Sequence, residues 1–594
     1  MKRERKYLWL ILFLLLILVL IGCSDDGGIP AGSISGEVLF PGYQKGEIYV
    51  LALKAKDAGK IRQMETEAYP YLSQYVISYT ALSCPGPYEI EWLSSGNYVL
   101  WSWNDVNSDG GVNHLDYAES VGWHQKKDQL FPPVSITVGA GEAVKGMDIN
   151  LVSLTPYPEE DLSVMEGRGG GTLQTIKNQK VLHLWGTPEE RGYACGYLLG
   201  SQIVEFLNYT LIEYFAKSIP FYENTFLPFV RTQCTVSSDR WAEVDAMLRG
   251  MRNSGSSMRL KHLGREITRD DILAQNNLYL LLVYPLRAYW PLPLGNPDGY
   301  IETVSPSCTS AVFWGPWTQN SQIEGELIHG KNNDGENDLR KMTVNSLLVM
   351  AVEPPTGSSL KRVMKVDWPG FYGTYHGINE AGLVLAAHGV PTMPNWDATN
   401  FFDYSTLYIQ TLQHCSTIED ANAFWDKSNE TRPAGWNSGI STPYRQGVAG
   451  HASVTYETDS FGGLIREPDY MEPDDPFSIF TTNNFFKYSG IVPKAVSILN
   501  GYHDGILSKN YRYRAMLELL ESYQAESKTI GTTEVIEFLR IASNLPKYHD
   551  ITEFSIIFYP NRMTLALAKE DLEKKILNAP YAQYTTFSFD EVFQ

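Results

Sequence analysis

The sequence predicts an α+β protein in which a small all-β module precedes a larger domain with two layers of strands flanked by helices. Three observations support this prediction. Residues 34–153 contain short apolar or alternating runs separated by glycine and proline. Residues 181–307 have mainly helical patterns. Apolar runs typical of buried strands return from Cys308 onward, with helical segments between them.

The N-terminus has the pattern of an export signal. A basic segment precedes the unbroken apolar run Leu8–Ile21, which is short for a transmembrane helix. The run leads into Leu-Ile-Gly-Cys, which resembles the bacterial lipobox, whose cysteine is lipidated after cleavage. We therefore expect a lipoprotein signal peptide at 1–22, lipidation of Cys23 and a polar tether at 23–33. The expected location is the bacterial cell envelope, at the outer membrane or the cell surface.

The chain is acidic and has one cysteine that stands out. Its 594 residues carry a formal net charge of −20, which disfavours nucleic acid and anionic lipid surfaces because both repel negative charge. The lipid anchor is therefore the only membrane contact that we expect. Cysteines at positions 84, 195, 234, 308 and 415 form no Cys-x-x-Cys pair. An odd number in an oxidising compartment leaves at least one free thiol, and Cys308 is the candidate.

The module at 34–153 is expected to be a β-sandwich. Strands are predicted at 35–40, 47–53, 88–92, 97–103, 134–138 and 147–151. The ordered patterns Ser-Gly-x-Val, Gly-x-Tyr-x-Leu and Ile-x-Leu are similar to those of carboxypeptidase-regulatory-like and related immunoglobulin-like modules on bacterial surface proteins. This resemblance implies an immunoglobulin-like β-sandwich that acts as a spacer, and it implies no activity.

One loop of the module has the spacing of a calcium site. Side-chain oxygens occupy positions 1, 3, 5, 9 and 12 of a twelve-residue stretch with glycine at position 6, which permits the sharp turn. The expected ligands are Asp105, Asn107, Asp109, Gly111, Asn113 and Asp116. Aspartate replaces the usual bidentate glutamate at the last position. A structural ion that pins the loop is one interpretation, and an Asx/Gly-rich turn without an ion is the other.

A linker and a second domain follow. Residues 154–180 are rich in Pro, Glu, Arg and Gly, which predicts a hinge. In the domain at 181–594, the stretch Thr187–Glu190 has the residues of a helix N-terminus: Thr at the cap, Pro at the first position and Glu at the third. Further helices are expected at 241–251, 270–284 and 511–520. Strands are expected at 346–352, 361–366, 477–482, 554–559 and 563–568, and a strand–turn–strand is expected at 377–389 with its turn at 379–382.

Cys308 begins an apolar, strand-like run, Cys308–Trp314, and a second strand then leads to Asp334. If the bond between Ser307 and Cys308 is cut, Cys308 becomes an N-terminal residue. Its α-amine, with a reference pKa of about 8, could then take the proton of its own thiol. A lone buried cysteine in a strand would give the same pattern, and from these residues alone it is the more common situation.

Six motifs in order resemble a known enzyme family. They are Gly-Tyr-Ala-x-Gly, Ser-Cys-Thr, His-Gly-Lys-Asn-x-Asp, Gly-Ile-Asn-Glu-Ala-Gly-Leu, Thr-Asn-Asn-Phe and Arg-Tyr-x-Arg, spread from about residue 192 to 514. This set is similar to the isopenicillin-N acyltransferase family of N-terminal-nucleophile cysteine hydrolases. The resemblance implies a four-layer αββα sandwich and self-cleavage that frees the cysteine.

The resemblance also implies roles for single residues. Cys308 matches the nucleophile, Asp334 the carboxylate that holds the freed α-amine, and Asn483 the donor to the oxyanion. The residues that match substrate-binding positions are Lys331, Asn484 and Arg512. Lys331 stands where relatives often carry Arg, whose forked contact a lysine cannot reproduce. Asn484 stands where histidine is common.

Simpler interpretations of the same residues stay open. Asn-Asn-Asp-Gly around Asp334 is also an ordinary hairpin turn, and the asparagines at Asn483 also suit the end of a strand. His376 and His388 suggest a papain-like pairing of cysteine with histidine, although no sequence pattern fixes their geometry.

The sequence therefore predicts an exported, lipid-anchored cysteine amidohydrolase or acyltransferase that cleaves a linear, small-molecule amide and needs no cofactor for catalysis. Hydrolysis is favoured over acyl transfer, because water is abundant outside the cell. The alternatives are a phospholipase-B-like lipid hydrolase and an inactive, calcium-stabilised surface binding protein.

Overall fold

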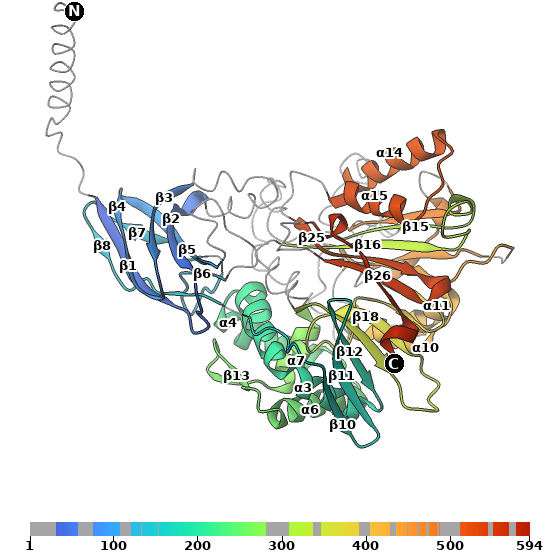
Figure 1. The fold of residues 1–594 in the computed structure, drawn as a ribbon, viewed down its shortest axis with the longest axis horizontal. Helices are drawn as coiled ribbons and strands as arrows, with labels where there is room; N and C mark the ends of the chain where they lie inside the picture. Colours follow the sequence, from blue (N-terminus) through green and yellow to red (C-terminus); the bar gives the residue numbers. More distant parts are fainter. Residues whose placement is uncertain are drawn as a thin grey trace, which may run out of the picture.

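The computed structural model describes most of the chain outside its N-terminus (Figure 1). The described residues are 31–57, 75–106, 120–131, 133–152, 154–278, 280, 308–336, 346–390, 404–427, 435–447, 450–459, 462–470, 475–483, 486–487, 511–543, 550–569 and 578–594. Within these ranges no helix combines the length and the apolar character that crossing a membrane requires.

The N-terminal module consists of two small sheets that share one apolar core. One sheet contains β4 (Gly86–Leu93), β1 (Gly32–Leu39), β8 (Ala143–Val144) and β9 (Ile149–Asn150). The other contains β3 (Val76–Leu82), β2 (Glu47–Lys54), β5 (Gly96–Asp105), β6 (Val121–Trp123) and β7 (Ile136–Val138). Side chains from both sheets, among them Ile34, Val50 and Leu100, are fully buried together. The predicted strands are thus present. Three further strands, β3, β6 and β8, are additional, and β3 is a half-exposed edge strand.

The module contacts the next part of the chain directly. The Leu130 backbone N–H donates to the Lys217 carbonyl oxygen at 2.6 Å. The Phe131 ring lies 5.0 Å from the Tyr214 ring, centroid to centroid. The module and the following helices therefore share a packed interface in addition to their covalent connection.

A ten-stranded sheet forms the base of the large domain. In spatial order its strands are β10 (Leu162–Glu166), β11 (Gly169–Ile176), β12 (Gln179–Trp185), β17 (Leu348–Glu353), β18 (Val363–Asp367), β19 (His376–Asn379), β20 (Val384–Val390), β21 (Gly435–Ser441), β22 (Ser453–Asp459) and β23 (Gly462–Arg466). The pairing of β12 with β17 is parallel and joins Val181–Trp185 to Val349–Glu353. All other neighbours in this sheet are antiparallel.

A six-stranded antiparallel sheet carries Cys308. Its order is β24 (Ser478–Thr481), β15 (Cys308–Phe313), β16 (Ile328–Glu336), β25 (Asp550–Tyr559), β26 (Thr564–Lys569) and β27 (Thr585–Ser588). Period-two alternation gives β25 two apolar faces. Phe554, Ile556 and Phe558 join the core of the ten-stranded sheet, whereas Ile557 faces helices on the other side.

Helices cover the outer face of each sheet. Against the ten-stranded sheet lie α3 (Pro188–Glu205), α6 (Ser238–Asn253), α7 (Arg269–Asn276), α10 (Tyr404–His414) and α11 (Ile418–Lys427). Between α3 and α6 come the π-helical segments η3 (Phe206–Ala216) and η4 (Tyr222–Phe226) with α4 (Ile219–Phe221) and α5 (Leu227–Gln233). Against the six-stranded sheet lie α14 (Tyr511–Ala525) and α15 (Thr532–Ser543), and α16 (Phe589–Val592) ends the chain.

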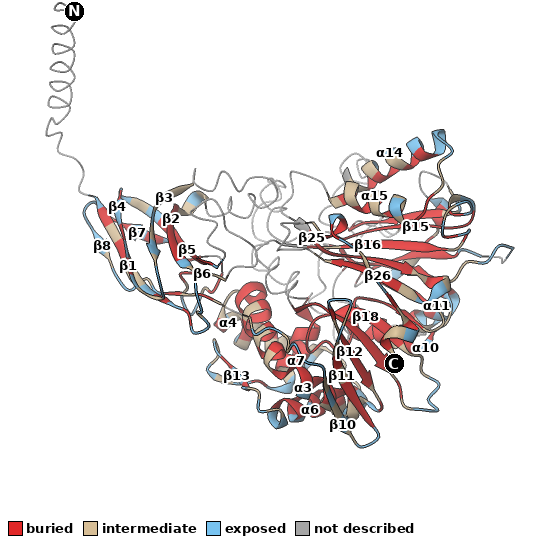
Figure 2. Cartoon of the chain, viewed as in Figure 1, coloured by how far each residue is buried: buried red, intermediate tan, exposed pale blue. Residues whose placement is uncertain are grey.

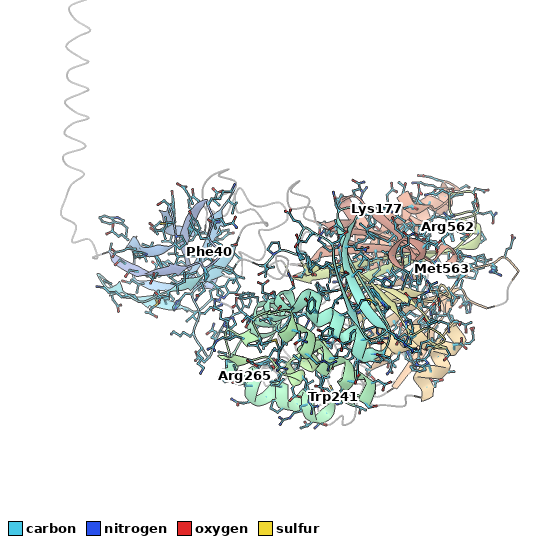
Figure 3. The ribbon with its side chains drawn as sticks, turned by 60° about the horizontal axis from the view of Figure 1, so that its bottom comes forward. Phe40, Lys177, Trp241, Arg265, Arg562 and Met563 are labelled. Carbon is cyan, nitrogen blue, oxygen red and sulfur yellow. The ribbon has the colours of Figure 1, made fainter. Side chains whose placement is uncertain are left out.

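The resulting order is helices, sheet, sheet, helices. Figure 2 shows the inner strands of both sheets buried, whereas the edge strands β10 and β23 are largely half-buried or exposed. In Figure 3, Trp241 marks α6 in the helical layer beneath the ten-stranded sheet, and Arg562 and Met563 mark the turn between β25 and β26. Cys308 thus begins a strand whose two faces are covered by other layers.

Helix α3 begins as the sequence predicts. The Thr187 hydroxyl accepts from the Glu190 backbone N–H, and the Glu190 carboxylate accepts from the Thr187 N–H at 2.7 Å, which completes a capping box. Its glycines allow α6 to approach closely. A Cβ on Gly196 would lie 1.9 Å from the Met247 carbonyl oxygen, so no larger residue fits there.

The stretch 154–180, expected to be a linker, is different. Residues 162–176 form β10 and β11 at the edge of the ten-stranded sheet. The glycines at 169–171 are buried in β11. A Cβ on Gly171 would lie 3.0 Å from the Ala194 Cβ of α3. These glycines provide room for helix packing rather than flexibility.

Candidate active site

Cys308 lies at the N-terminal end of an interior strand of the six-stranded sheet. It is the first residue of β15, which runs between β16 and β24, and it pairs with Asn333 of β16. Its side chain is 6% exposed. Its backbone N–H donates to the Asn483 Oδ1 at 2.7 Å, across 175 residues of sequence. The nitrogen that a cut before Cys308 would turn into an α-amine is therefore already held by a side chain.

Two side chains of β16 contact the thiol. The Lys331 Nζ and the Asn333 Oδ1 each lie 3.9 Å from the Cys308 Sγ, and these two atoms lie 3.2 Å from each other. Burial raises the pKa of the Cys308 thiol, while the charge of Lys331 lowers it. The thiol therefore depends on its immediate neighbours to ionise.

Asp334 follows Asn333 at a bulge of β16 and is buried. Its Oδ2 accepts from the Arg512 guanidinium at 3.1 Å, and its Oδ1 accepts from the Thr552 hydroxyl at 2.6 Å. Burial raises the pKa of this carboxyl to about 6, and Arg512 opposes the rise. Asp334 is thus a carboxylate that titrates close to neutral pH.

Arg512 joins the parts of the site. From the first turn of α14 its Nη1 donates to the Cys308 carbonyl oxygen, the Thr309 hydroxyl and the Asp334 carboxylate at 3.0–3.1 Å. Its Nη2 donates to the Asn483 Oδ1 at 2.7 Å. The planar fork of arginine suits such multiple contacts. In this structure Arg512 organises the residues around Cys308, whereas the sequence assigned it to the substrate.

Asn483 follows β24 and is fully buried. Its Oδ1 accepts from the Cys308 N–H and from Arg512, and its Nδ2 donates to the Gly389 carbonyl oxygen at 2.6 Å. One of its two amide N–H bonds is thereby engaged, so one remains for an oxyanion. The expected donor is thus beside Cys308, and its carbonyl oxygen has a positioning contact that sequence alone did not predict.

A buried ion pair supports the Asn483 segment. Glu457 of β22 accepts from the backbone N–H groups of Phe486 and Lys487 at 2.9–3.1 Å and from the Arg466 guanidinium at 2.8 Å. Arg466 also donates to the Phe480 carbonyl oxygen at 2.8 Å. Contacts on both sides of Asn483 therefore fix its backbone to β22 and β23.

The two histidines considered for a Cys–His pair have other surroundings. The His388 Nε2 lies 2.8 Å from the Ser310 hydroxyl, which also contacts the His329 Nε2 at 3.2 Å. His376 is buried against the Phe554 ring. Burial lowers the pKa of His388 and of His376 well below the usual range, and that of His329 to about 3. All three are neutral imidazoles, and none of them contacts the Cys308 Sγ in the described structure.

Several predicted sites fall outside the described residues. Asn484, the lipidation site Cys23 and the calcium-loop positions from Asn107 to Asp116 belong to this group. Asp105, the first position of the loop, ends β5 and is buried. No cluster of three or more metal-binding side chains occurs among the described residues. All five cysteines from Cys84 onward have free thiols.

Sequence reasoning missed Thr552, Asn333 and Glu457. Thr552 and Asp334 are paired residues on neighbouring strands, and Glu457 is 0% exposed within an alternating strand. A buried acidic residue in a strand needs partners, and this was the one signal available for Glu457.

Among known proteins, the comparisons found similarity only to solved structures. No protein-family model and no curated protein matches the sequence. Solved structures do match, and each of the three described below covers 48% of this chain. An N-acylethanolamine-hydrolyzing acid amidase ortholog of Caenorhabditis elegans is 12% identical, with all of that chain covered and a TM-score of 0.29. A mutant of the conjugated bile acid hydrolase of Clostridium perfringens is 12% identical, with 97% of that chain covered and a TM-score of 0.29. Penicillin V acylase of Agrobacterium tumefaciens is 14% identical, with 87% of that chain covered and a TM-score of 0.30.

Proposed function

We propose that this chain is an exported, lipid-anchored cysteine amidohydrolase of the N-terminal-nucleophile kind. One observation carries the proposal: the backbone nitrogen and the thiol of Cys308 each have a buried polar side chain as a contact partner. The nitrogen is 2.7 Å from the Asn483 Oδ1, and the thiol is 3.9 Å from the Lys331 Nζ. A structural cysteine needs neither contact, because a buried thiol behaves as a small apolar group.

The chemistry follows from these contacts. Once the bond before Cys308 is cut, the Asn483 Oδ1 and the Asp334 region hold the new α-amine close to its own thiol. The thiolate then attacks the carbonyl carbon of a linear amide, and an acyl-cysteine forms as the amine leaves. The free N–H of the Asn483 amide is available to the oxyanion. Water attacks the acyl-cysteine in the second step and releases the acid.

The cellular location of the protein is part of the same proposal. Its support is the basic and apolar N-terminus that leads into Leu-Ile-Gly-Cys23. Acylation of Cys23 would tether the β-rich module, which would hold the catalytic domain away from the membrane. Calcium bound by the 105–116 loop would stiffen this spacer and would take no part in catalysis.

Self-cleavage is the most direct test. The soluble chain from Ser24 should split into two fragments, with Cys308 as the new N-terminal residue, by intact mass and N-terminal sequencing. Cys308→Ala should stay whole, while Cys415→Ala, which removes another buried thiol, should split normally. A wild-type chain that stays whole and turns over no amide would reject the proposal.

Substrate panels separate the alternatives. Fluorogenic N-acyl amides with short, long and aromatic acyl groups test the amidase, and matched phospholipid esters test a lipid hydrolase. Turnover of esters alone would favour the phospholipase-B-like activity. A chain that turns over neither class and whose Cys308 is not labelled by acyl-amide probes would favour a binding protein.

A further inference from the structure

Lys331 has the surroundings of a proton-transfer group rather than of a surface cation. It is 1% exposed and lies on the face of β16 that points between the two sheets, with its Nζ 3.9 Å from the Cys308 Sγ and 3.2 Å from the Asn333 Oδ1. Among the described residues, no carboxylate lies within 4 Å of this nitrogen. A lysine buried without a counter-ion gives up its proton readily.

The other charged and titratable groups near the thiol already have hydrogen-bond or ion-pair partners. Asp334 binds Arg512 and Thr552. A guanidinium group has only donors and offers no acceptor for a proton. The remaining titratable groups around Lys331 are His329 on β16 itself and, on strands of the facing ten-stranded sheet, Lys365, Asp367, His376 and His388.

None of those five contacts the thiol within the described structure. Lys365 donates to the Phe371 carbonyl oxygen at 2.9 Å and pairs with Asp367 at 3.3 Å. The histidines are neutral and are bound or packed elsewhere. Lys331 is therefore the one described titratable side chain within hydrogen-bonding distance of the Cys308 Sγ.

Electrostatics agree with this geometry. Burial lowers the pKa of Lys331, and the charges of Cys308, Asp334 and Asp367 only oppose this. Burial raises the pKa of the Cys308 thiol, and Lys331 opposes that rise. The two shifts bring the affinities of amine and thiol for one proton towards each other, so the proton can pass between them.

We propose that Lys331 is the acid–base partner of Cys308, present before the chain is cut and independent of an α-amine. The S–H proton moves to the Lys331 Nζ as the sulfur attacks the carbonyl carbon. The S–C bond forms, the C–N bond breaks, and the Lys331 ammonium gives its proton to the leaving nitrogen. The amine is restored at the end of the step. This rests on the proposed amide-cleaving function, for which it supplies the base that the uncut chain lacks.

Lysine and arginine differ in the way that matters for this proposal. An arginine at this position would supply a permanent charge and no proton acceptor. A lysine at 331 can supply both. Exchange between these two residues therefore separates the role of charge from the role of proton transfer.

The test uses the soluble chain from Ser24 with Lys331→Arg and Lys331→Met. The first measurement is alkylation of Cys308 by iodoacetamide between pH 5 and pH 9, followed by peptide mass mapping. Exposed Cys84 in the same molecule is the internal reference. The second measurement is self-cleavage and amide turnover by intact mass and product release. Circular dichroism and thermal unfolding check that each variant is folded.

The expected results differ between the variants. Lys331→Met should slow alkylation of Cys308 at pH 7 at least tenfold relative to Cys84, because the thiol loses its charged partner. Lys331→Arg should keep alkylation within about threefold of wild type, yet lose cleavage and turnover about a hundredfold or more, the usual contribution of a general base.

Each contrary result has a distinct meaning. Normal cleavage by Lys331→Arg would overturn the proton transfer, and unchanged alkylation in Lys331→Met would overturn any control of the thiol. If both variants fail to fold, Lys331→Gln takes their place, because it keeps a polar side chain without a proton acceptor of comparable basicity, and normal self-cleavage by that folded variant would overturn the proposal. If the wild type neither cleaves itself nor turns over amides, the proposed function fails, while the alkylation results still test the pairing.

Discussion

Replacing Asp334 with asparagine should change how the stability of the domain depends on pH. Burial raises the pKa of the Asp334 carboxyl to about 6 in the folded chain, against the opposing charge of Arg512. In an unfolded chain the pKa of an aspartate is about 3.9. Between these values the folded state holds a proton that the unfolded state has lost. Stability from this proton is complete below about pH 4 and is lost as the pH rises through about 6.

The size of the effect follows from the same two values. A difference of about two pKa units, at about 1.4 kcal/mol for each unit, amounts to about 3 kcal/mol lost between pH 4 and pH 7. An asparagine at 334 does not titrate. The free energy of unfolding of the variant, relative to the parent, should therefore rise by about 3 kcal/mol over this range. Any constant cost of the substitution cancels in the comparison of two pH values.

Urea unfolding at pH 4 and pH 7 measures this difference. Both chains carry Cys308→Ala so that they stay uncut. Asp367→Asn is a matched control, since burial also raises the pKa of Asp367 to about 6, but that carboxylate pairs with Lys365. Both substitutions should shift stability in the same direction, while in chains that retain Cys308 only Asp334→Asn should slow self-cleavage. A relative stability of Asp334→Asn that is equal at the two pH values would refute the reasoning.

Three further predictions concern packing, loop support and the ion. Gly196→Ala should lower the free energy of unfolding by about 2 kcal/mol or more, because its Cβ would collide with the Met247 carbonyl oxygen. Glu457→Gln should cost about 3 kcal/mol in urea unfolding and lower the turnover number more than the affinity, since it loosens the segment that holds Asn483. Calcium at about a hundred times its dissociation constant should stabilise the β-rich module by about 2.7 kcal/mol, and Asp105→Asn should weaken this gain.

Matched measurements keep these predictions specific. Ser201→Ala in the same helix as Gly196 should leave stability almost unchanged. A Glu457→Gln enzyme with unaltered turnover would show that the Asn483 segment does not depend on the ion pair. If the thermal unfolding midpoint is the same in calcium and in chelator, the loop binds no calcium.

The sequence predicted elements with strong local signals and missed those that depend on distant packing. The cap at Thr187 is local, because its partner Glu190 lies three residues away, and the structure has it. The glycines at 169–171 looked like a hinge because sequence cannot show that Ala194 packs against them. The same limit applies to Asn483, whose role as acceptor for the Cys308 N–H emerges only when 175 residues fold back.

At the candidate site, too, sequence predicts which residues are present but not which of them are in contact. Lys331 was assigned to substrate because the resemblance supplied a position and no neighbours. Its distance from the Cys308 Sγ depends on the register of β15 and β16, in which Ser310 and Lys331 are opposite each other. One residue of slip would turn Lys331 to the helical face and remove it from the thiol.

The parallel ladder between β12 and β17 has a consequence for the processed protein. β12 precedes Cys308 and β17 follows it, so a cut before Cys308 would leave neighbouring strands of one sheet in different polypeptides. Pairing of Val181–Trp185 with Val349–Glu353 would still hold them, as would the bond from the Gln179 Nε2 to the Leu347 carbonyl oxygen at 2.9 Å. Two bands on a denaturing gel and one species on a native gel would be the signature. If the proposed cleavage and the proposed lipidation of Cys23 both take place, the processed protein would be a two-chain complex, with the lipid on one chain and Cys308 on the other.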